Sequence, residues 1–187
     1  MYASRGYQST GVAEEQSRDR ITLTASDADL VVGTITIGFD SGNGLLVDEL
    51  FYENIADLRR NGMLLCEFTK LAMDSVMRSR RVLASLFHVA YIYAHRVRGY
   101  DFLLIEVNPR HVRYYERMLG FKVKGPERLN PRVNAPAVLM ALDFRHAREQ
   151  IDLFGGKPEV SADERSLYPQ FFSLAEEAGI LARLHDR

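Results

Sequence analysis

Apolar and polar residues alternate from Arg20 onwards, and this alternation marks the start of regular structure. The alternating stretch ends at the turn-forming residues 26–29, and residues 30–39 are then rich in β-branched side chains. Together these segments predict a β-hairpin. Downstream, apolar residues recur at helical spacing until Asn61 and Gly62, which predicts a short helix that ends there.

The middle of the chain has the pattern strand, helix, strand. Residues 63–73 form a largely apolar run that predicts a buried strand. Residues 76–98 are apolar nearly all round through their middle, which predicts a long helix packed on both sides and ended by Gly99. Residues 102–107 predict the central strand of the sheet.

The next segment favours a second, shorter helix. Asn108 is a suitable cap and Pro109 suits the first turn of a helix. This helix is expected to end at Gly120, and further strands are expected over residues 121–123 and 138–142. Because two helices connect neighbouring strands, we expect an α/β fold with a mixed sheet that is parallel in its middle and flanked by helices.

The same pattern divides the chain into three parts. Residues 1–19 are polar without periodicity and are expected to form an N-terminal arm. Residues 20–142 carry the predicted sheet, and residues 143–187 are expected to form a helical C-terminal extension. Within the extension, Ser161 and Glu164 have the spacing of a capping box and predict a helix start.

Composition and charge narrow the class of protein. The chain has 187 residues, of which 47% are hydrophobic and 26% charged, and this suits one globular domain. The formal net charge of −1 argues against a nucleic-acid partner, and no apolar run is long enough to span a membrane. The start of the chain lacks an export signal, and the single cysteine, Cys66, cannot form an intrachain disulfide, so a cytoplasmic protein is expected.

The first candidate for chemistry is the carboxylate of Glu67, which stands inside an apolar strand. Glu67 and Thr69 share one face of that strand, and Lys70 points to the other. Burial raises the pKa of a carboxyl group and can make it a useful proton acceptor. The alternative is a structural ion pair with one of the nearby arginines.

Two further candidates follow the two central strands. Arg78, Arg80 and Arg81 surround the start of the long helix, where guanidinium and backbone N–H groups suit a phosphate diester. The alternative is a solvated basic turn. Asn108 is expected at the carboxyl end of the central strand, where it can hold an amide-bearing chain while a Tyr on the next helix donates a proton. The alternative for Asn108 is plain helix capping.

No metal or nucleotide motif accompanies these candidates. His88 and His95 are seven residues apart on one helix, without a third ligand nearby, so we interpret them as packing residues. The sequence has neither a phosphate loop ending in Gly-Lys-Ser/Thr nor a Gly-x-Ser-x-Gly motif. We therefore expect no metal site.

These candidates together resemble the GNAT acyltransferase superfamily, in which a strand–loop–helix cradles the donor's phosphate and the next strand ends in Asn before a helix bearing Tyr. Residues 66–72, Cys-Glu-Phe-Thr-Lys-Leu-Ala, are similar to the Glu-Leu-Ser/Thr-Arg-Phe/Leu-Ala motif of acyl-homoserine-lactone synthases. The chain resembles the N-acyl amino acid synthases of the FeeM type more closely still. That resemblance covers roughly residues 20–142 and includes residues 33–35, 50–51, 108–111 and 131–137.

The resemblance implies transfer of a long-chain acyl group from an acyl carrier protein to the amine of a small amino acid. It implies no cofactor, with an acyl-phosphopantetheine thioester as co-substrate, and peripheral membrane contact only through a lipid product. The implied catalytic residues are Glu67 and Tyr115, and the implied acceptor-binding residues are Thr69, Lys70 and Arg132. The implied donor-binding residues are Met73, Arg78, Arg80, Arg81, Asn108 and His111.

Two departures from relatives refine this expectation. The loop expected to meet the donor is rich in arginine but lacks the glycines of acetyl-CoA-using relatives, which favours a carrier-bound donor. Residues 1–19 lack the acidic and aromatic set that holds S-adenosylmethionine in lactone synthases, which favours an open-chain product. Two alternatives remain. One is a related acyltransferase with another amine acceptor, of exosortase-linked or homoserine-lactone type. The other is a non-catalytic module that binds acyl carrier proteins or has a regulatory role.

Overall fold

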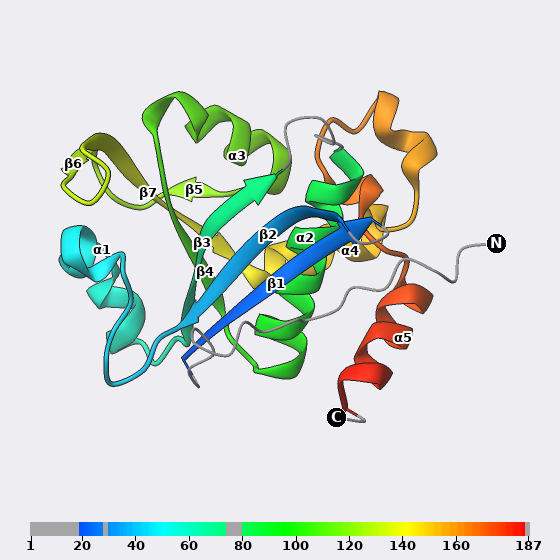
Figure 1. Cartoon of the computed structure of the whole chain (residues 1–187), viewed down its shortest axis with the longest axis horizontal. Coiled ribbons are helices and arrows are strands. Elements are labelled where there is room, and N and C mark those ends of the chain that lie inside the picture. The colour runs from blue at the N-terminus through cyan, green and yellow to red at the C-terminus, as the bar shows by residue number, and fades with distance from the viewer. Residues whose placement is uncertain (1–18, 28–29, 74–79, 186–187) are drawn as a thin grey trace.

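The computed structural model describes residues 19–27, 30–73 and 80–185, which form a mixed sheet covered by helices (Figure 1). The strands follow the order β1-β2-β3-β4-β7-β5, with β6 paired to β7. They are β1 (Arg20–Asp27), β2 (Leu30–Phe39), β3 (Leu65–Met73), β4 (Phe102–Val107), β5 (Lys122–Val123), β6 (Arg128–Asn130) and β7 (Ala135–Asp143). β1 and β2 form the predicted antiparallel hairpin.

The helices that the structure describes are α1 (Asp48–Arg60), α2 (Arg80–Tyr91), α3 (Val112–Leu119), α4 (Phe144–Phe154) and α5 (Leu174–His185). A 3₁₀ turn at Pro109–His111 precedes α3, and two more, at Pro158–Ala162 and Tyr168–Gln170, lie between α4 and α5. None of the described helices is long and apolar enough to cross a membrane.

β3 and β4 run parallel, as predicted for two strands joined by a helix, but they pair only at their beginnings. Residues 65–67 pair with residues 102–104. Beyond this point the strands diverge, and Figure 1 shows β3 and β4 separating toward their carboxyl ends. The divergence leaves space at the edge of the sheet where ligands bind in α/β proteins.

The second expected parallel pair does not form. β7 lies between β4 and β5 and is antiparallel to both, so β3 with β4 is the parallel pair within the described part of the chain. β7 also begins at Ala135, earlier than predicted, because residues 135–137 pair with β6. The predicted mixed sheet flanked by helices is confirmed, while its parallel part is smaller than expected.

Apolar side chains form a core on each face of the sheet. On one face, α1 packs Phe51 and Ile55 against Leu65, Leu104 and Leu139 of the sheet. The other face carries a larger core, to which α2, α3, α4 and the segment before α5 contribute. Because each fully buried side chain of this kind contributes about 1.5–3 kcal/mol, both cores hold the central strands firmly in place.

The predicted long helix consists of two helical segments in the described residues. α2 passes at Tyr91 into a π-helical segment, Ile92–Val97. Gly99 then adopts a φ of 75°, a left-handed conformation that ends the helix as predicted. The expected beginning of this helix, at residues 76–79, lies outside the described residues.

The capping box of the C-terminal extension lies at a later position than predicted. Ser161 and Glu164 lie in or beside a 3₁₀ turn and open no α-helix. The same spacing recurs at Ser173 and Glu176, where each side chain accepts the other's backbone N–H, at 3.3 Å and 2.9 Å, and α5 begins. Tyr168, in the 3₁₀ turn between the two positions, is buried in the larger core.

A buried histidine joins the extension to α2. The ring of His88 stacks on Phe171 and Phe172, and its Nδ1 accepts the backbone N–H of Phe172 at 3.0 Å. The other ring nitrogen, Nε2, therefore carries the proton and donates to Glu177 at 3.2 Å. Glu177 also accepts a hydrogen bond from Arg148 at 2.9 Å. His88 is thus a packing residue, as predicted.

Candidate active site

A cavity of about 270 Å³ lies where β3 and β4 diverge. Its apolar walls are Ile35, Phe68, Leu71, Phe87, Ile105 and Val107. The predicted site residues that line it are Thr69, Lys70, Asn108, His111 and Tyr115. An apolar cavity with a few convergent polar groups is the usual form of a small-molecule site. We refer to it below as the main cavity.

β3 is irregular at the edge of the main cavity. Thr34 pairs with Ala72 and Thr36 pairs with Thr69, so β3 has one more residue than β2 in this interval. Lys70 adopts a φ of 49°, and this left-handed conformation costs a non-glycine residue about 1–2 kcal/mol. Such a bulge interrupts the ladder and redirects the strand, here beside the cavity.

Asn108 occupies the carboxyl end of β4, as predicted. Its Oδ1 accepts the backbone N–H of Arg110 at 3.2 Å, which caps the turn that leads into α3, and Pro109 stands in the first position of that turn. The side-chain amide of Asn108 donates to the carbonyl of Pro136 on β7 at 3.5 Å. Asn108 therefore combines its capping role with a place on the wall of the main cavity.

Tyr115 and His111 reach the main cavity from α3 and the turn before it. Tyr115 is half-buried against the rings of Phe87 and Phe121. Burial raises the pKa of its hydroxyl above the ordinary value, so the group stays protonated at neutral pH. His111 is exposed, and its Nε2 lies 3.1 Å from the Nε of Arg110, which donates to it.

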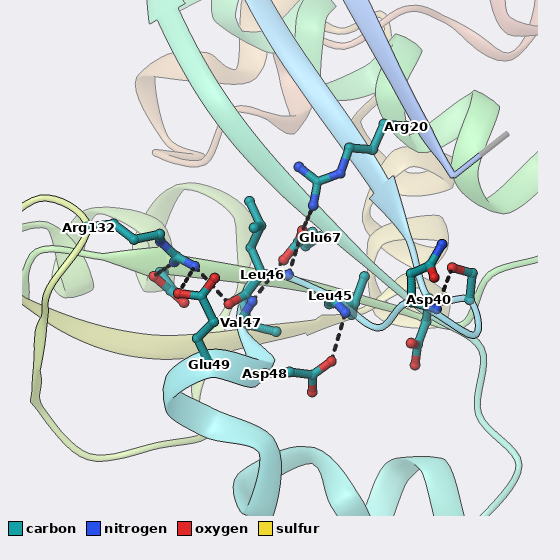
Figure 2. Close-up of polar contacts among 12 residues, drawn as sticks. Arg20, Asp40, Leu45, Leu46, Val47, Asp48, Glu49, Glu67 and Arg132 are labelled. Atoms are coloured by element: carbon teal, nitrogen blue, oxygen red, sulfur yellow. Dashed lines mark hydrogen bonds and ion pairs between the residues drawn. The ribbon is translucent and has the colours of Figure 1, made fainter. Parts of the chain in front are cut away.

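Glu67 does not line the main cavity but a smaller one of about 140 Å³, together with Arg20 and Gly38. Its fully buried carboxylate accepts the backbone N–H groups of Leu46 at 3.0 Å and Val47 at 3.1 Å (Figure 2). Burial raises the pKa of Glu67, although these hydrogen bonds and the guanidinium of Arg20 at 3.5 Å act in the opposite direction. Through these two hydrogen bonds the carboxylate holds the backbone just before α1 in place.

The sequence prediction missed a second carboxylate, Glu106 of β4, which lines the main cavity. Its Oε2 accepts hydrogen bonds from Asn130 at 2.6 Å and Arg132 at 2.7 Å. Arg132 also contacts Glu49 and the carbonyl oxygen of Leu46, each at 2.9 Å (Figure 2). The guanidinium of Arg132, predicted to bind the acceptor, is thus held by groups of the protein itself.

Two of the predicted donor-binding residues, Arg80 and Arg81, lie in the first turn of α2. Arg80 donates to the carbonyl oxygen of Ser166 at 3.0 Å and so ties α2 to the segment before α5. Arg81 is exposed on the first turn of α2, and Met73 ends β3. Arg78 lies outside the described residues.

Comparisons with known proteins support this interpretation of the fold. The family model of the N-acyl amino acid synthase FeeM matches residues 1–143. The structure of FeeM, an N-acyl amino acid synthase from uncultured soil microbes, is 30% identical, with a TM-score of 0.65 over 71% of this chain and 72% of that chain. No curated protein matches the chain.

Two lactone synthases share the fold at lower identity. The CoA-dependent acyl-homoserine lactone synthase BjaI is 14% identical, with a TM-score of 0.55 over 73% of this chain and 64% of that chain. The CoA-dependent synthase MesI is also 14% identical, with a TM-score of 0.51 over 72% of this chain and 69% of that chain. This likeness concerns the fold alone.

The mixed sheet, its diverging parallel strands and the synthase matches define the class of protein: an N-acyltransferase with a GNAT-like fold. The family match extends over well more than half of the chain. The chain belongs to the FeeM family of N-acyl amino acid synthases. The resemblance found in the sequence is therefore confirmed.

Proposed function

We propose that this N-acyltransferase moves a long-chain acyl group from an acyl carrier protein thioester to the amine of an amino acid and releases an open-chain N-acyl amino acid. The observation that carries the proposal is the main cavity between the diverging strands, in a chain of the FeeM family. Its apolar walls suit a pantetheine arm and an acyl chain, while Asn108 and Lys70 suit an amide and a carboxylate.

The reaction forms a bond between the amine nitrogen and the acyl carbon and breaks the carbon–sulfur bond. An amino acid enters as an ammonium ion, so its nitrogen must lose one proton before the attack and a second one afterwards. One proton goes to the departing thiolate, and the other goes to a base and then to water. The protein's task is to hold the amine against the thioester and to move these protons.

We assign Tyr115 as the residue that donates a proton to the departing thiolate. It lines the main cavity, and its raised pKa keeps the hydroxyl protonated at neutral pH. A thiol has an ordinary pKa of about 8.5, below that of a phenol. Tyr115 therefore stabilises the thiolate by donating a hydrogen bond and by passing on a proton, without remaining ionised itself.

We assign Glu67 as the base that accepts the other proton. Burial raises its pKa, which makes the carboxylate a better proton acceptor. Thr69 lines the main cavity two residues further along β3, about 7 Å away by strand geometry. The proton therefore reaches Glu67 through an intervening hydroxyl or water, without direct contact between Glu67 and the substrate.

The charge near the start of α2 supports a carrier-bound donor. Arg80 and Arg81 begin the described part of this helix, and Phe87 of the same helix lines the main cavity. Acyl carrier proteins are acidic, so a basic surface beside the cavity accelerates their encounter with the enzyme.

A product assay tests the proposal. The protein is incubated with a long-chain acyl carrier protein or the matching acyl-CoA, together with all common amino acids, and the products are identified by mass spectrometry. Parallel reactions include S-adenosylmethionine. We expect an N-acyl amino acid without S-adenosylmethionine, formed faster from the carrier than from CoA.

Each other outcome would contradict a definite part of the proposal. Product that requires S-adenosylmethionine, with release of methylthioadenosine, would identify a lactone synthase. Equal turnover of the two donors would remove the carrier protein from the proposal. No product from any combination would favour a module without this activity.

A further inference from the structure

Two buried oxygen atoms of the main cavity lack a hydrogen-bond partner among the described residues: Thr69 Oγ1 and Glu106 Oε1. Both side chains line the main cavity. Buried polar atoms are almost always paired in native proteins, because leaving one unpaired costs its full desolvation penalty. Two such atoms in one cavity indicate a ligand that donates hydrogen bonds to both.

The register of the sheet brings these two atoms to the same level. Glu67 is the last residue of β3 that pairs with β4, opposite Leu104. Thr69 and Glu106 each follow two residues later, so both side chains point to the same face as Glu67 and Leu104. Because the two strands diverge beyond the paired residues, the main cavity opens there, and both Thr69 and Glu106 line it.

The surroundings of Glu106 favour a cationic ligand over a neutral or anionic one. Its Oε2 is held by Asn130 and Arg132, at 2.6 Å and 2.7 Å, which orients the carboxylate and leaves Oε1 turned away from these partners. A carboxylate oxygen only accepts hydrogen bonds, whereas a threonine hydroxyl accepts or donates. The negative charge of Glu106 also contributes to raising the pKa of nearby Glu67. A cationic donor at Oε1 fits this environment better than a neutral one.

We propose that Glu106 Oε1 and Thr69 Oγ1 bind the amine of the acceptor, and that Arg132 and Asn130 are positioning residues that hold Glu106 in place. The inference rests on the proposed function and extends it by naming the atoms that contact the acceptor nitrogen. An ammonium group donates one hydrogen to each oxygen and keeps its third direction free. Loss of its proton through Thr69 toward Glu67 then exposes the lone pair that attacks the thioester.

Isosteric variants test this assignment. Glu106→Gln keeps the shape and one acceptor for Asn130 and Arg132, but it turns an amide NH₂ toward the amine. Thr69→Val removes the hydroxyl at nearly constant volume. Glu177→Gln is the matched control, because Glu177 is also a buried carboxylate bound to arginine and histidine but lies away from the main cavity.

The measurements are KM for the acceptor, KM for the acyl donor, kcat and thermal stability, with both amino acids and amino acid amides as acceptors. A hydrogen bond to a charged group corresponds to a factor of about 10 to 100 in binding. We expect Glu106→Gln to raise the acceptor KM by about that factor and Thr69→Val by about 3- to 10-fold, with an unchanged donor KM. Glu177→Gln should lower thermal stability without changing the acceptor KM.

The possible results separate this inference from the proposed function. An unchanged acceptor KM in Glu106→Gln, with amino acid acylation intact in the wild type, would overturn the amine site alone. A wild type that acylates amides but no amino acid would overturn the proposed acceptor class. In that case a raised KM of Glu106→Gln for the amide would support the amine site, and an unchanged one would overturn it. A wild type that acylates no amine at all would overturn both.

Discussion

Replacing Glu67 with Gln should weaken the attachment of the segment before α1 to the sheet. The two carboxylate oxygens of Glu67 accept the backbone N–H groups of Leu46 and Val47, at 3.0 Å and 3.1 Å. Gln offers a single acceptor and turns an N–H donor toward the other backbone N–H. A buried N–H left unpaired costs about 1–3 kcal/mol, and relief from burying a charge offsets part of the loss. We expect Glu67→Gln to lower the free energy of unfolding by about 2 kcal/mol, or Tm by about 4–8 °C.

Protonation of Glu67 adds a second contribution to stability, and the pH dependence of that contribution has a definite sign. Burial raises the pKa of Glu67 above its ordinary value of 4.5, so the folded state binds this proton more tightly than the unfolded state does. The resulting stability is fully present below pH 4.5 and is lost as the pH rises through the folded pKa. Gln does not titrate at this position. The stability difference between the wild type and Glu67→Gln should therefore narrow as the pH rises through this range.

Thermal unfolding followed by circular dichroism over a pH series measures both effects. Arg20→Gln serves as the control, since Arg20 lies 3.5 Å from Glu67 with 34% of its side chain exposed, and its loss should cost less than about 1 kcal/mol. At a temperature where both proteins are folded, removal of a general base should slow turnover by about two to four orders of magnitude. An unchanged Tm would refute the structural argument, and near-normal turnover of a folded variant would refute the assignment of Glu67 as base.

Three further substitutions give predictions of other kinds. Gly38→Ala would place a Cβ 2.9 Å from the Cγ of buried Glu67. It should therefore lower the free energy of unfolding, measured with urea, by about 1–3 kcal/mol. An unchanged free energy of unfolding would show that Glu67 is free to move. Burial lowers the pKa of His88 below 6.5, so stability should fall as the pH drops below 6.5. His88→Gln should flatten this part of the stability–pH curve, and an equally steep curve would contradict the assignment to His88. Arg81→Glu should reduce kcat/KM for an acyl carrier protein about 10-fold at low salt and much less at high salt. A reduction that does not depend on salt would argue against an electrostatic encounter between the carrier protein and the enzyme.

The parts of the fold that could be predicted from the sequence are those that depend on residues close together in the chain. The cap formed by Asn108 and Pro109 and the helix end at Gly120, with a φ of 80°, depend on residues adjacent in the chain. The insertion of β7 between β4 and β5 depends on pairing between distant segments, and the pattern of apolar residues carries no information about it. The capping-box spacing occurs twice in the extension, and the spacing alone does not show which of the two positions opens an α-helix.

The candidate site was predictable to a similar degree. The motif around Thr69, Lys70 and Asn108 indicated residues that the structure assembles around one cavity. The separation of Glu67 from this cavity follows from the residue at which β3 and β4 stop pairing, which the sequence does not reveal. Glu106 carried the same signal as Glu67, a carboxylate in an apolar strand, but only the structure shows that one of its oxygens lacks a partner among the described residues.

The contacts of the C-terminal extension show that the family match and the folded core have different limits in the chain. The family match ends at residue 143, whereas the main core includes Leu167, Tyr168 and Phe171. The hydroxyl of Tyr168 donates to the carbonyl of Leu119, at the end of α3, at 2.7 Å. A protein shortened after residue 143 would expose the apolar surface of α2 and leave His88 without its partners, which favours aggregation. The family match therefore ends before the core is complete. The core is complete only after residues as far as Phe171 have been synthesised.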